Sequence, residues 1–356
     1  MTDKKFGTQA AEMLKKAPVE VKVKRLSAGK FRRYHRISWW RQLLDIGTVL
    51  QNVRDLFYTF YGVLQSLVLL WRFKPDVVFT KGGFVCVPLG FAAHLLRIPL
   101  VIHDSDAHPG LANRILARWA TSIGTGSPLE DYNYPKGRAH YVGIPVNRTF
   151  RPVTGREQQK LKDLCGLHDT KKPLVVVTGG GLGARNINRA IVAIAPKLLE
   201  KAAIVHITGD ATYQETIERA PEHVDYIVKP FISTGLAPLF GAADVVVSRA
   251  GATTMQELAA MAKAVVLVPN PLLTGGHQLK NAAVYDKAGA VMVVDEDRLV
   301  VNPLLLQKAI GQLIGDAGKR ERLGKRLHDF ARPDAAVDMA ALIVEAVATY
   351  KQQKAA

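Results

Sequence analysis

The most constraining feature of this 356-residue chain is a strand–turn–helix pattern that occurs twice in succession between Ala243 and Asn281. One apolar run ends in a glycine-containing turn and a helical pattern, and the next ends in a Gly-Gly turn and a polar helix start. Adjacent parallel strands bring such turns to one edge of a sheet, where helix N-termini bind phosphate groups. The pattern therefore predicts an open α/β sheet with a site for a phosphate-bearing ligand, which we interpret as a nucleotide sugar.

Short apolar runs alternate with helical patterns along the whole chain, which indicates parallel sheets with crossover helices. We expect strands at 19–24, 76–80, 100–102, 122–125, 140–142, 174–178, 203–207, 224–228, 244–247, 264–268 and 290–293. We expect helices at 43–72, 87–96, 109–119, 302–328 and 334–352, and further helices between the later strands. The fold class is therefore α/β, with two doubly wound Rossmann-like domains facing a cleft. Residues 1–150 form the first domain, 151–172 a linker and 173–330 the second domain.

The beginning of the chain lacks the strand, Gly-rich turn and helix with which a doubly wound domain normally opens. Such a first strand lies at the centre of the sheet, and its loss would leave buried backbone groups unpaired. We therefore expect that about one βα unit is missing from the first domain and that Met1 is an internal methionine.

The net charge of +17 is concentrated near the front. Ten Lys and Arg residues lie between Lys15 and Arg41 against one acid, Glu20, and the apolar, aromatic stretch Leu43–Trp71 follows. Its longest uncharged run is sixteen residues, which is short of the ~20 that a spanning helix needs. The combination favours binding to an anionic membrane surface. The alternative is a core helix beside a solvated basic loop.

The two cysteines are far apart in the sequence, which indicates neither a disulfide framework nor a zinc site. A cytosolic location follows from the lack of a disulfide framework.

The turn at residues 179–185, GGGLGAR, follows an apolar strand and opens a helix. Its glycines allow backbone amides to approach a diphosphate. It is not a P-loop, because no Gly-Lys-Ser/Thr follows, and Asp210 lies too far along for a dinucleotide fingerprint. A tight turn without a ligand is the alternative. Asn188, one turn into the helix, points either into the cleft or to solvent.

The polar residues of the doubled pattern each allow two interpretations. Thr254 and Glu257 match a capping box, or Glu257 accepts hydrogen bonds from both ribose hydroxyls. Arg249 follows three valines at a strand end, where it neutralises a departing diphosphate or forms a surface ion pair. His277 and Gln278 bond sugar hydroxyls, or His277 caps its helix.

In the first half, a Gly-Gly turn at 82–83 is a second candidate anion loop, and His103, Asp104 and Asp106 follow a buried strand. Asp104 and Asp106 also match an Asp-x-Asp pattern that would hold Mg²⁺ or Mn²⁺ on a diphosphate. We expect no metal at this position, because the helix N-termini already supply an anion site. Asn113, on the following helix, turns inward to a ligand or caps locally.

Six segments carry a resemblance to a known family: TKGGFVCVPLGFAA, VIHDSDAHPGLANRILARWA, VGIPVNR, VTGGGLGARNIN, VVSRAGATTMQELAA and HQLKNA. In this order and spacing they resemble the peripheral-membrane N-acetylglucosaminyltransferases of peptidoglycan synthesis, the MurG family of glycosyltransferase family 28. The resemblance covers roughly residues 6–350. It implies the two-domain GT-B fold, with the final helix, at 331–356, returning to the first domain. It also implies inverting transfer of N-acetylglucosamine from UDP-N-acetylglucosamine to undecaprenyl-pyrophosphoryl-N-acetylmuramoyl-pentapeptide (lipid I), giving lipid II.

The resemblance also implies roles for individual residues. Glu257 would bind the ribose, Arg249 would stabilise the leaving UDP, and the loop from Gly180 through Gly181 to Arg185 would close over the donor. The other residues implied to bind substrate are Thr253 and Thr254 at the diphosphate, Phe231 and Ile232 at the uracil, His277, Gln278 and Asn281 at the sugar, and Asn188. The Gly82-Gly83 loop, Asp104, Asp106 and Asn113 would face the acceptor.

This chain departs from the family pattern at four places. His103-Asp104-Ser105-Asp106 stands where the family has His-Glu-Gln-Asn, and Gly181-Leu182 where it has Ser-Gln. The Arg of the Gly-Asn-Pro-Val-Arg motif is displaced by one, to Arg148. The family's first Gly loop, whose His is the general base, is missing, so His103 and Asp104 are the substitute bases and we expect the chain to bind UDP but to turn over poorly.

The partners that follow are UDP-N-acetylglucosamine, lipid I, the anionic cytoplasmic surface of the cell membrane and other cell-wall synthesis proteins, with no cofactor and no nucleic acid. Three alternatives stay open: a related glycosyltransferase acting on diacylglycerol, a dinucleotide-dependent oxidoreductase and a basic nucleic-acid-binding protein. The missing carboxylate after GGGLGAR disfavours the oxidoreductase, and the aromatic apolar stripe favours a membrane over nucleic acid.

Overall fold

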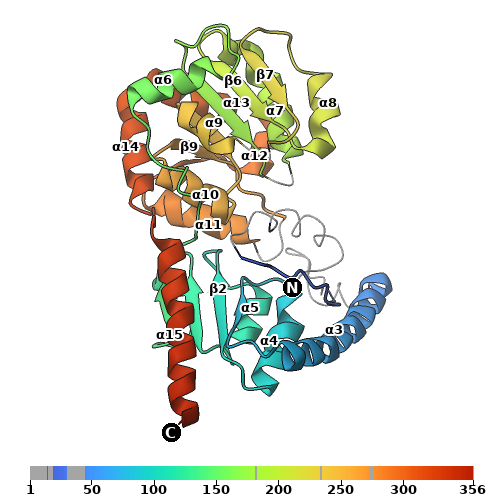
Figure 1. Ribbon diagram of the computed structural model, residues 1–356. Coiled ribbons are helices and arrows are strands. Elements are labelled where there is room, and N and C mark those ends of the chain that lie inside the picture. The colour runs from blue at the N-terminus through green and yellow to red at the C-terminus, as the bar shows by residue number, and fades with distance from the viewer. Residues whose placement is uncertain are drawn as a thin grey trace. The chain divides into compact units, whose positions relative to one another are not determined.

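The computed structural model describes residues 14, 19–29, 45–180, 183–232, 235–272 and 276–355 (Figure 1). The chain divides into two compact units: unit 1 is Met1–Gly143 with Ala336–Ala356, and unit 2 is Ile144–Ala335. The boundary therefore lies at Gly143–Ile144, earlier than the expected position after residue 150. Residues 1–13, on which the expectation of a missing βα unit depends, lie outside the described residues.

The described sheet of unit 1 consists of parallel strands in the order β1-β2-β3-β4. These strands are β1 (Val78–Thr80), β2 (Leu100–Asp104), β3 (Ser122–Thr125) and β4 (Ala139–Tyr141). The helices of this unit are α3 (Ile46–Phe73), α4 (Cys86–Leu95), α5 (Leu111–Leu116), the short η1 (Leu129–Asp131) and α15 (Ala335–Ala355).

Side chains alternate across β2, as the pleat of a strand requires, and each face has its own core. Leu100 and Ile102 pack with Leu116 and Ile123 on one face. On the other face Val101 packs with residues of α15, namely Met339, Leu342 and Ala346. Helix α15 therefore belongs to unit 1.

Helix α3 buries several polar side chains and exposes most of its large apolar ones. Its buried positions include Thr48, Asp55 and Ser66, whereas Phe57 is 70% exposed and Trp71 67% exposed. The other large apolar side chains exposed on this helix are Leu50, Val53, Leu56, Tyr58, Phe60, Tyr61, Leu64, Val68 and Phe73. Together these exposed residues make up the outer face of α3. The helix is longer than its uncharged run, and Gly47–Phe73 is by length and mean hydropathy able to cross a membrane. That is weak evidence of spanning, because a core helix can pass the same criterion.

The segment Leu26–Gly29 lies on the inner face of α3 and explains its polar character. The backbone N–H of Ser27 donates to Gln65 Oε1 at 2.9 Å, and that of Gly29 donates to Thr59 Oγ1 at 3.2 Å. The approach is so close that a Cβ on Gly62 would lie 2.0 Å from the carbonyl oxygen of Ser27.

The expected strand at 19–24 is wrong, since this segment joins no sheet and only an isolated bridge occurs, at Arg25. Val19 is 69% exposed and Val21 40% exposed. Their alternation with charged residues is typical of a half-buried strand, but Val19 and Val21 are exposed and pack in no core among the described residues. Burial therefore does not stabilise a strand here.

Unit 2 contains a parallel sheet in the order β10-β9-β8-β5-β6-β7. Its strands are β5 (Leu174–Thr178), β6 (Ala203–Ile207), β7 (Tyr226–Lys229), β8 (Val245–Ser248), β9 (Ala264–Leu267) and β10 (Met292–Val293). The helices are α6 (Gly155–Asp163), α7 (Arg185–Leu199), α8 (Tyr213–Ile217), α9 (Leu236–Ala242), α10 (Ala252–Ala260), α11 (His277–Lys287), α12 (Glu296–Val301), α13 (Leu304–Gly315) and α14 (Ala317–His328), with η2 (Asp210–Thr212).

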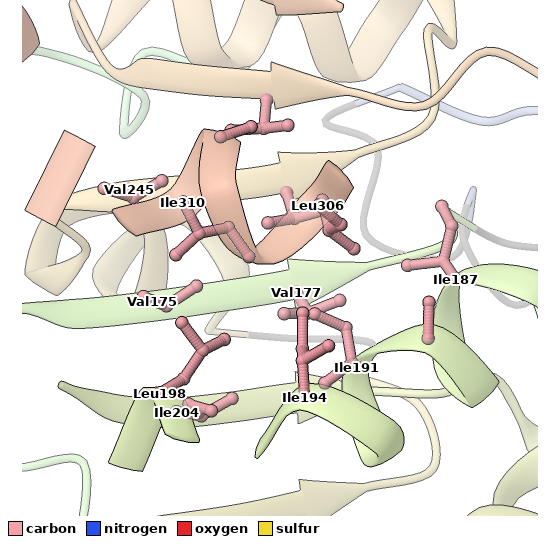
Figure 2. Packing of buried hydrophobic residues seen from close by; sticks show 14 of the residues in the cluster. Val175, Val177, Ile187, Ile191, Ile194, Leu198, Ile204, Val245, Leu306 and Ile310 are labelled. Carbon is pink, nitrogen blue, oxygen red and sulfur yellow. The ribbon is translucent and has the colours of Figure 1, made fainter. Parts of the chain in front are cut away.

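The central strands of unit 2 are buried on both faces, which explains their continuous apolar sequence. Figure 2 shows side chains of α7 and α13, among them Ile194 and Leu306, gathered around Val175 and Val177 of β5. A second cluster on the opposite face includes Val176, and it is covered by α9, α10 and α11. Both domains are thus parallel α/β layers, as the strand–helix alternation predicted.

Residues 151–172, expected as a linker, belong to unit 2. They contain α6, which packs on α9, and Leu161, Cys165 and Leu167 lie against the core of that unit. Lys162 forms a 2.6 Å ion pair with Asp244, and both side chains are largely buried. The many charges of this segment resemble a solvated linker, but they alternate with apolar residues that face the core.

The helix expected at 302–328 is two helices. The break is at Asp316, whose extended backbone (φ −131°) caps α14 through a 2.8 Å bond from Lys319 N to its Oδ1. Aspartate is a favourable N-cap residue, so the sequence did contain a signal for the break between α13 and α14.

Candidate functional site

The strand order of unit 2 reverses between β5 and β8, which are neighbours in the sheet. From β5 the chain runs outward through β6 and β7, and from β8 it runs outward the other way through β9 and β10. In open α/β sheets ligands bind beyond the carboxyl ends of the strands at such a switch point. The loops after β5 and β8 are therefore the structural starting point for a site.

The conformation of the loop after β5 favours glycine at two positions. Gly180 has φ 71° and Gly183 φ 70°, a region that other residues rarely adopt. A Cβ on Gly183 would also lie 2.8 Å from the carbonyl oxygen of Thr208. Helix α7 then begins at Arg185 after Ala184, which provides no side-chain cap. The first amides of α7 thus lack a capping side chain, as an anion site requires. Gly181 lies outside the described residues.

The loop after β8 leads into α10, whose N-cap is Gly251, again without a side-chain cap. Thr253 and Thr254 lie in the first turn, so Thr254 is not the N-cap and the capping-box alternative is wrong. Two threonine amides without intrahelical partners therefore face the strand ends of the sheet.

Glu257 is the most unusual residue of this loop and helix. Burial raises the pKa of its carboxyl to about 7. Within the described part of the chain, neither an ion pair nor a hydrogen bond compensates this burial. A half-buried carboxylate without donors is costly, and two hydroxyl donors from a ribose would satisfy it.

Arg249 forms an ion pair, but a buried one. Its Nη2 donates to Glu296 Oε1 at 2.6 Å, and its Nη1 donates to the carbonyl of Val268 at 3.0 Å. The side chains of Arg249 and Glu296 are only 8% and 5% exposed. Arg249 does lie at the carboxyl end of β8, as expected, with its plane fixed by two contacts.

Gln278 and Asn281 hold the site loops together. Gln278 Oε1 accepts from the N–H of Asn270 at 2.9 Å, and Asn281 Nδ2 donates to the carbonyl of Ala250 at 3.1 Å. His277 is the first residue of α11, and the cap of that helix is Gly276, with φ 66°, rather than His277. The contacts of Gln278 and Asn281 are within the protein, so their contact with sugar hydroxyls stays a prediction.

Asn188 points neither to a cleft nor to solvent. It is buried at 2% exposure, and its Nδ2 donates to the Thr208 carbonyl and to Thr212 Oγ1, both at 2.9 Å. Its Oδ1 bonds the ring of His206 at 3.0 Å, and burial lowers the pKa of that ring to about 3. Asn188 thus holds the carbonyl of Thr208, which lies against Gly183 of the Gly loop.

Four other predicted residues are exposed or only partly buried. Phe231 and Ile232 line a 440 Å³ cavity together with Leu161, Lys229, Pro238 and Leu239. Arg185 pairs with Glu215 at 3.3 Å and is exposed. Arg148 is exposed as well. Their contacts with donor or acceptor stay predictions.

In unit 1, β2 ends in a polar cluster built around Asp104. Asp104 Oδ2 accepts from the Tyr134 hydroxyl at 2.7 Å, and the carboxyl is 4% exposed. Burial raises the pKa of Asp104 to about 6, while the bonds from Tyr134 and Asn113 oppose that rise. Asn113 Nδ2 also donates to the carbonyl of His103 at 3.2 Å, and its Oδ1 is buried without a hydrogen-bond partner among the described residues. Asn113 therefore turns inward, and it packs against Gly82.

His103 is fully buried, and both ring nitrogens are engaged. Nε2 bonds the carbonyl of Gly143 at 2.8 Å and Nδ1 bonds Ser105 Oγ at 3.2 Å. Burial lowers the pKa of this ring. His103 therefore presents no ring nitrogen to a substrate in this structure. The role of either His103 or Asp104 as the base stays a prediction.

The Asp-x-Asp pattern does not form a metal centre by itself. Asp104 is occupied by Tyr134, while the backbone carbonyl of Asp106 accepts from Tyr132 at 2.6 Å. In the described part of the chain no three His, Cys, Asp or Glu side chains gather as metal ligands would. The expectation that no metal is used stays a prediction.

Sequence reasoning missed Glu296, Tyr134 and Asn186. Glu296 stands next to Asp295, which caps α12, so the pair looked like an exposed acidic helix start. Asn186 Nδ2 donates to the same Glu296 Oε1 at 2.9 Å. One sequence signal was available: Glu296 follows an apolar strand, which places it beyond the carboxyl ends of the strands of the sheet.

The sequence matches two domains of one family. Residues 11–125 match the glycosyltransferase family 28 N-terminal domain, and residues 174–338 match the C-terminal domain. A relative from Lachnospira eligens is 35% identical over 292 residues, which cover 82% of this chain and 76% of the relative. One from Clostridium botulinum is 36% identical over 276 residues, covering 77% and 72%. Both are named UDP-N-acetylglucosamine–N-acetylmuramyl-(pentapeptide) pyrophosphoryl-undecaprenol N-acetylglucosamine transferase.

Solved structures show the same fold. Acinetobacter baumannii MurG superposes with a TM-score of 0.68 at 22% identity, covering 96% of this chain and 93% of that one. A UDP-GlcNAc 2-epimerase from Neisseria meningitidis bound to UDP-GlcNAc gives a TM-score of 0.59 at 13% identity, covering 86% and 90%. The two parallel α/β domains are therefore those of the GT-B architecture.

Proposed function

The chain belongs to glycosyltransferase family 28, and we propose that it transfers N-acetylglucosamine from UDP-N-acetylglucosamine to lipid I, giving lipid II. The names and 35–36% identity of its relatives support this reaction. The observation that carries the donor half is Glu257, a half-buried carboxylate whose pKa is raised to about 7 and which lies beside the uncapped start of α10. A ribose diol would donate hydrogen bonds to the carboxylate of Glu257, and a diphosphate would accept hydrogen bonds from the uncapped amides of α10.

In the proposed donor site, positive charge of the protein lies opposite the negative charge of the diphosphate. The N-termini of α7 and α10 supply partial positive charge for the diphosphate, and Arg249 adds a fixed guanidinium beside them. Interactions that strengthen as negative charge develops on the leaving group lower the barrier. These groups suffice for a metal-independent reaction, which is part of the proposal.

On the acceptor side we assign the base to Asp104. A carboxyl with a pKa of about 6 is ionised near neutral pH and is still basic enough to accept a proton from a hydroxyl. Deprotonation of the acceptor hydroxyl lets its oxygen attack the anomeric carbon, while the bond to UDP breaks and the configuration inverts.

The same proposal places the protein peripherally at the cytoplasmic face of the cell membrane. The outer face of α3 is apolar and aromatic, and such a face partitions into a lipid interface. The inner face of α3 packs on α4, which favours a helix lying on the surface over one that spans it. Contact with other cell-wall synthesis proteins, and roles in cell shape and division, would follow from the product.

The first test is calorimetric titration with UDP-N-acetylglucosamine and, separately, with NADH, both in the presence of EDTA. We expect binding of the UDP-sugar alone. A transfer assay with labelled donor then compares lipid I with diacylglycerol, and we expect transfer to lipid I that Asp104→Asn abolishes without weakening donor binding. Transfer only to diacylglycerol would contradict the proposed acceptor, and binding of NADH alone would contradict the donor.

A further inference from the structure

Four loops of unit 2 meet at one buried ion pair. Arg249 follows β8, Val268 follows β9, Glu296 follows β10, and Asn186 lies at the start of α7 after β5. The strands β10, β9, β8 and β5 are consecutive neighbours in the sheet. The bonds Arg249–Glu296, Arg249–Val268 and Asn186–Glu296 therefore tie together the loop ends of four adjacent strands.

The central carboxylate is shared between two donors. Glu296 Oε1 accepts from Arg249 Nη2 at 2.6 Å and from Asn186 Nδ2 at 2.9 Å. The side chain of Glu296 is 5% exposed and that of Arg249 is 8% exposed. Buried charge-assisted bonds of this length fix the plane of a guanidinium, and the carbonyl of Val268 fixes its second terminal nitrogen.

We propose that Glu296 is a positioning residue for the donor diphosphate: it orients the guanidinium of Arg249, and Asn186 couples that orientation to the helix after the Gly loop. This inference rests on the proposed function, because it takes Arg249 as a diphosphate ligand. The two bonds of Arg249 use one N–H of each terminal nitrogen out of five in the group, so donors are left for phosphate oxygens.

Two substitutions of Glu296 distinguish the effect of its negative charge from the effect of its hydrogen bonds to Arg249 and Asn186. Glu296→Gln keeps an acceptor oxygen for Arg249 and Asn186 but removes the negative charge, whereas Glu296→Ala removes both. We expect Glu296→Ala to weaken UDP binding by about tenfold, the value of one bond to a charged group. Glu296→Gln should bind UDP at least as well as the wild type does, because its arginine is oriented and no longer neutralised.

The control is another largely buried ion pair of unit 2, Lys162–Asp244, which also spans 2.6 Å but lies where β8 begins. Asp244→Ala disturbs the same sheet at its opposite edge, so it should leave UDP affinity unchanged. Uridine serves as the second probe, since it lacks the diphosphate and its affinity should be the same in all variants.

The experiment is calorimetry of the full chain with UDP and with uridine, at a temperature where circular dichroism shows each variant folded. A loss confined to UDP in Glu296→Ala, reversed in Glu296→Gln, supports the proposal. Equal losses of UDP and uridine, no loss of UDP, or an equal loss in Asp244→Ala would overturn it. If Glu296→Ala does not fold, Asn186→Ala replaces it, and unchanged UDP affinity there overturns the coupling. Wild-type chain that binds neither UDP nor UDP-N-acetylglucosamine would instead overturn the proposed function.

Discussion

The hydroxyl of Tyr134 donates a 2.7 Å hydrogen bond to Oδ2 of Asp104, across thirty positions of sequence. The bond stabilises the ionised carboxyl, yet burial outweighs it and the pKa of Asp104 still rises to about 6. Asp104 is therefore a residue whose position costs stability at neutral pH, as is common for groups kept for function.

Asp104→Asn should stabilise the protein at pH 8. The folded-state pKa lies above the unfolded value near 3.8, so the stability that wild-type Asp104 contributes is present below pH 4 and is lost as the pH rises through 6. A shift of about 2 units corresponds to roughly 2–3 kcal/mol. Urea unfolding at pH 8 and pH 4 measures the difference, which should fall to about 0.5 kcal/mol at pH 4. Exposed Glu130→Gln is the control, and an equal effect there would contradict the assignment.

Donor binding should depend on pH through Glu257. Its carboxyl, with a pKa of about 7, must be ionised to accept from two ribose hydroxyls, so UDP-N-acetylglucosamine should bind roughly tenfold more tightly at pH 8 than at pH 6. The donor is a suitable probe because its diphosphate has no terminal phosphate that titrates in this range. Calorimetry across this range tests the prediction. Glu257→Gln should bind weakly at every pH, and a variant that keeps the wild-type pH dependence would exclude Glu257 as its source.

The backbone of the site could be predicted from sequence because its determinants are local. Three consecutive valines before Ser248 indicate a strand buried on both faces, and the glycines at 179–183 indicate a turn that other residues would strain. Those two patterns suffice to place Arg249 and Glu257 at the carboxyl edge of one sheet.

The partners of the site residues could not be predicted, because they are distant in sequence. Glu296 reaches Arg249 across 47 positions, and His206 reaches Asn188 across 18. His103 illustrates the consequence: its place after β2 is local information, but the carbonyl of Gly143 that occupies its ring is not. Polar side chains near a predicted site are engaged by such contacts as readily as by ligands.

Asn188→Ala should destabilise the protein without removing the donor site. It leaves Nε2 of His206 without its buried partner and removes one of the two donors to the carbonyl of Thr208, which costs about 1–3 kcal/mol. Urea unfolding measures this loss, and donor affinity should stay within about threefold. Arg189→Ala, on the same helix, breaks only an exposed pair with Glu215 and should cost less than about 1 kcal/mol. If Asn188→Ala unfolded like the wild type but lost donor affinity, Asn188 would be a ligand residue after all.

Membrane association should depend on the outer face of α3. Phe60 and Trp71 are 64% and 67% exposed, and inserting such side chains into a lipid interface contributes on the order of 1.5–3 kcal/mol each. The double variant Phe60→Asp/Trp71→Asp should therefore sediment with phosphatidylglycerol vesicles at least about tenfold less than the wild type does. Leu164, which is 83% exposed in unit 2, gives the matched control Leu164→Asp, with no expected effect. Wild-type sedimentation of the double variant would show that the basic residues alone bind the vesicles, or that another surface does.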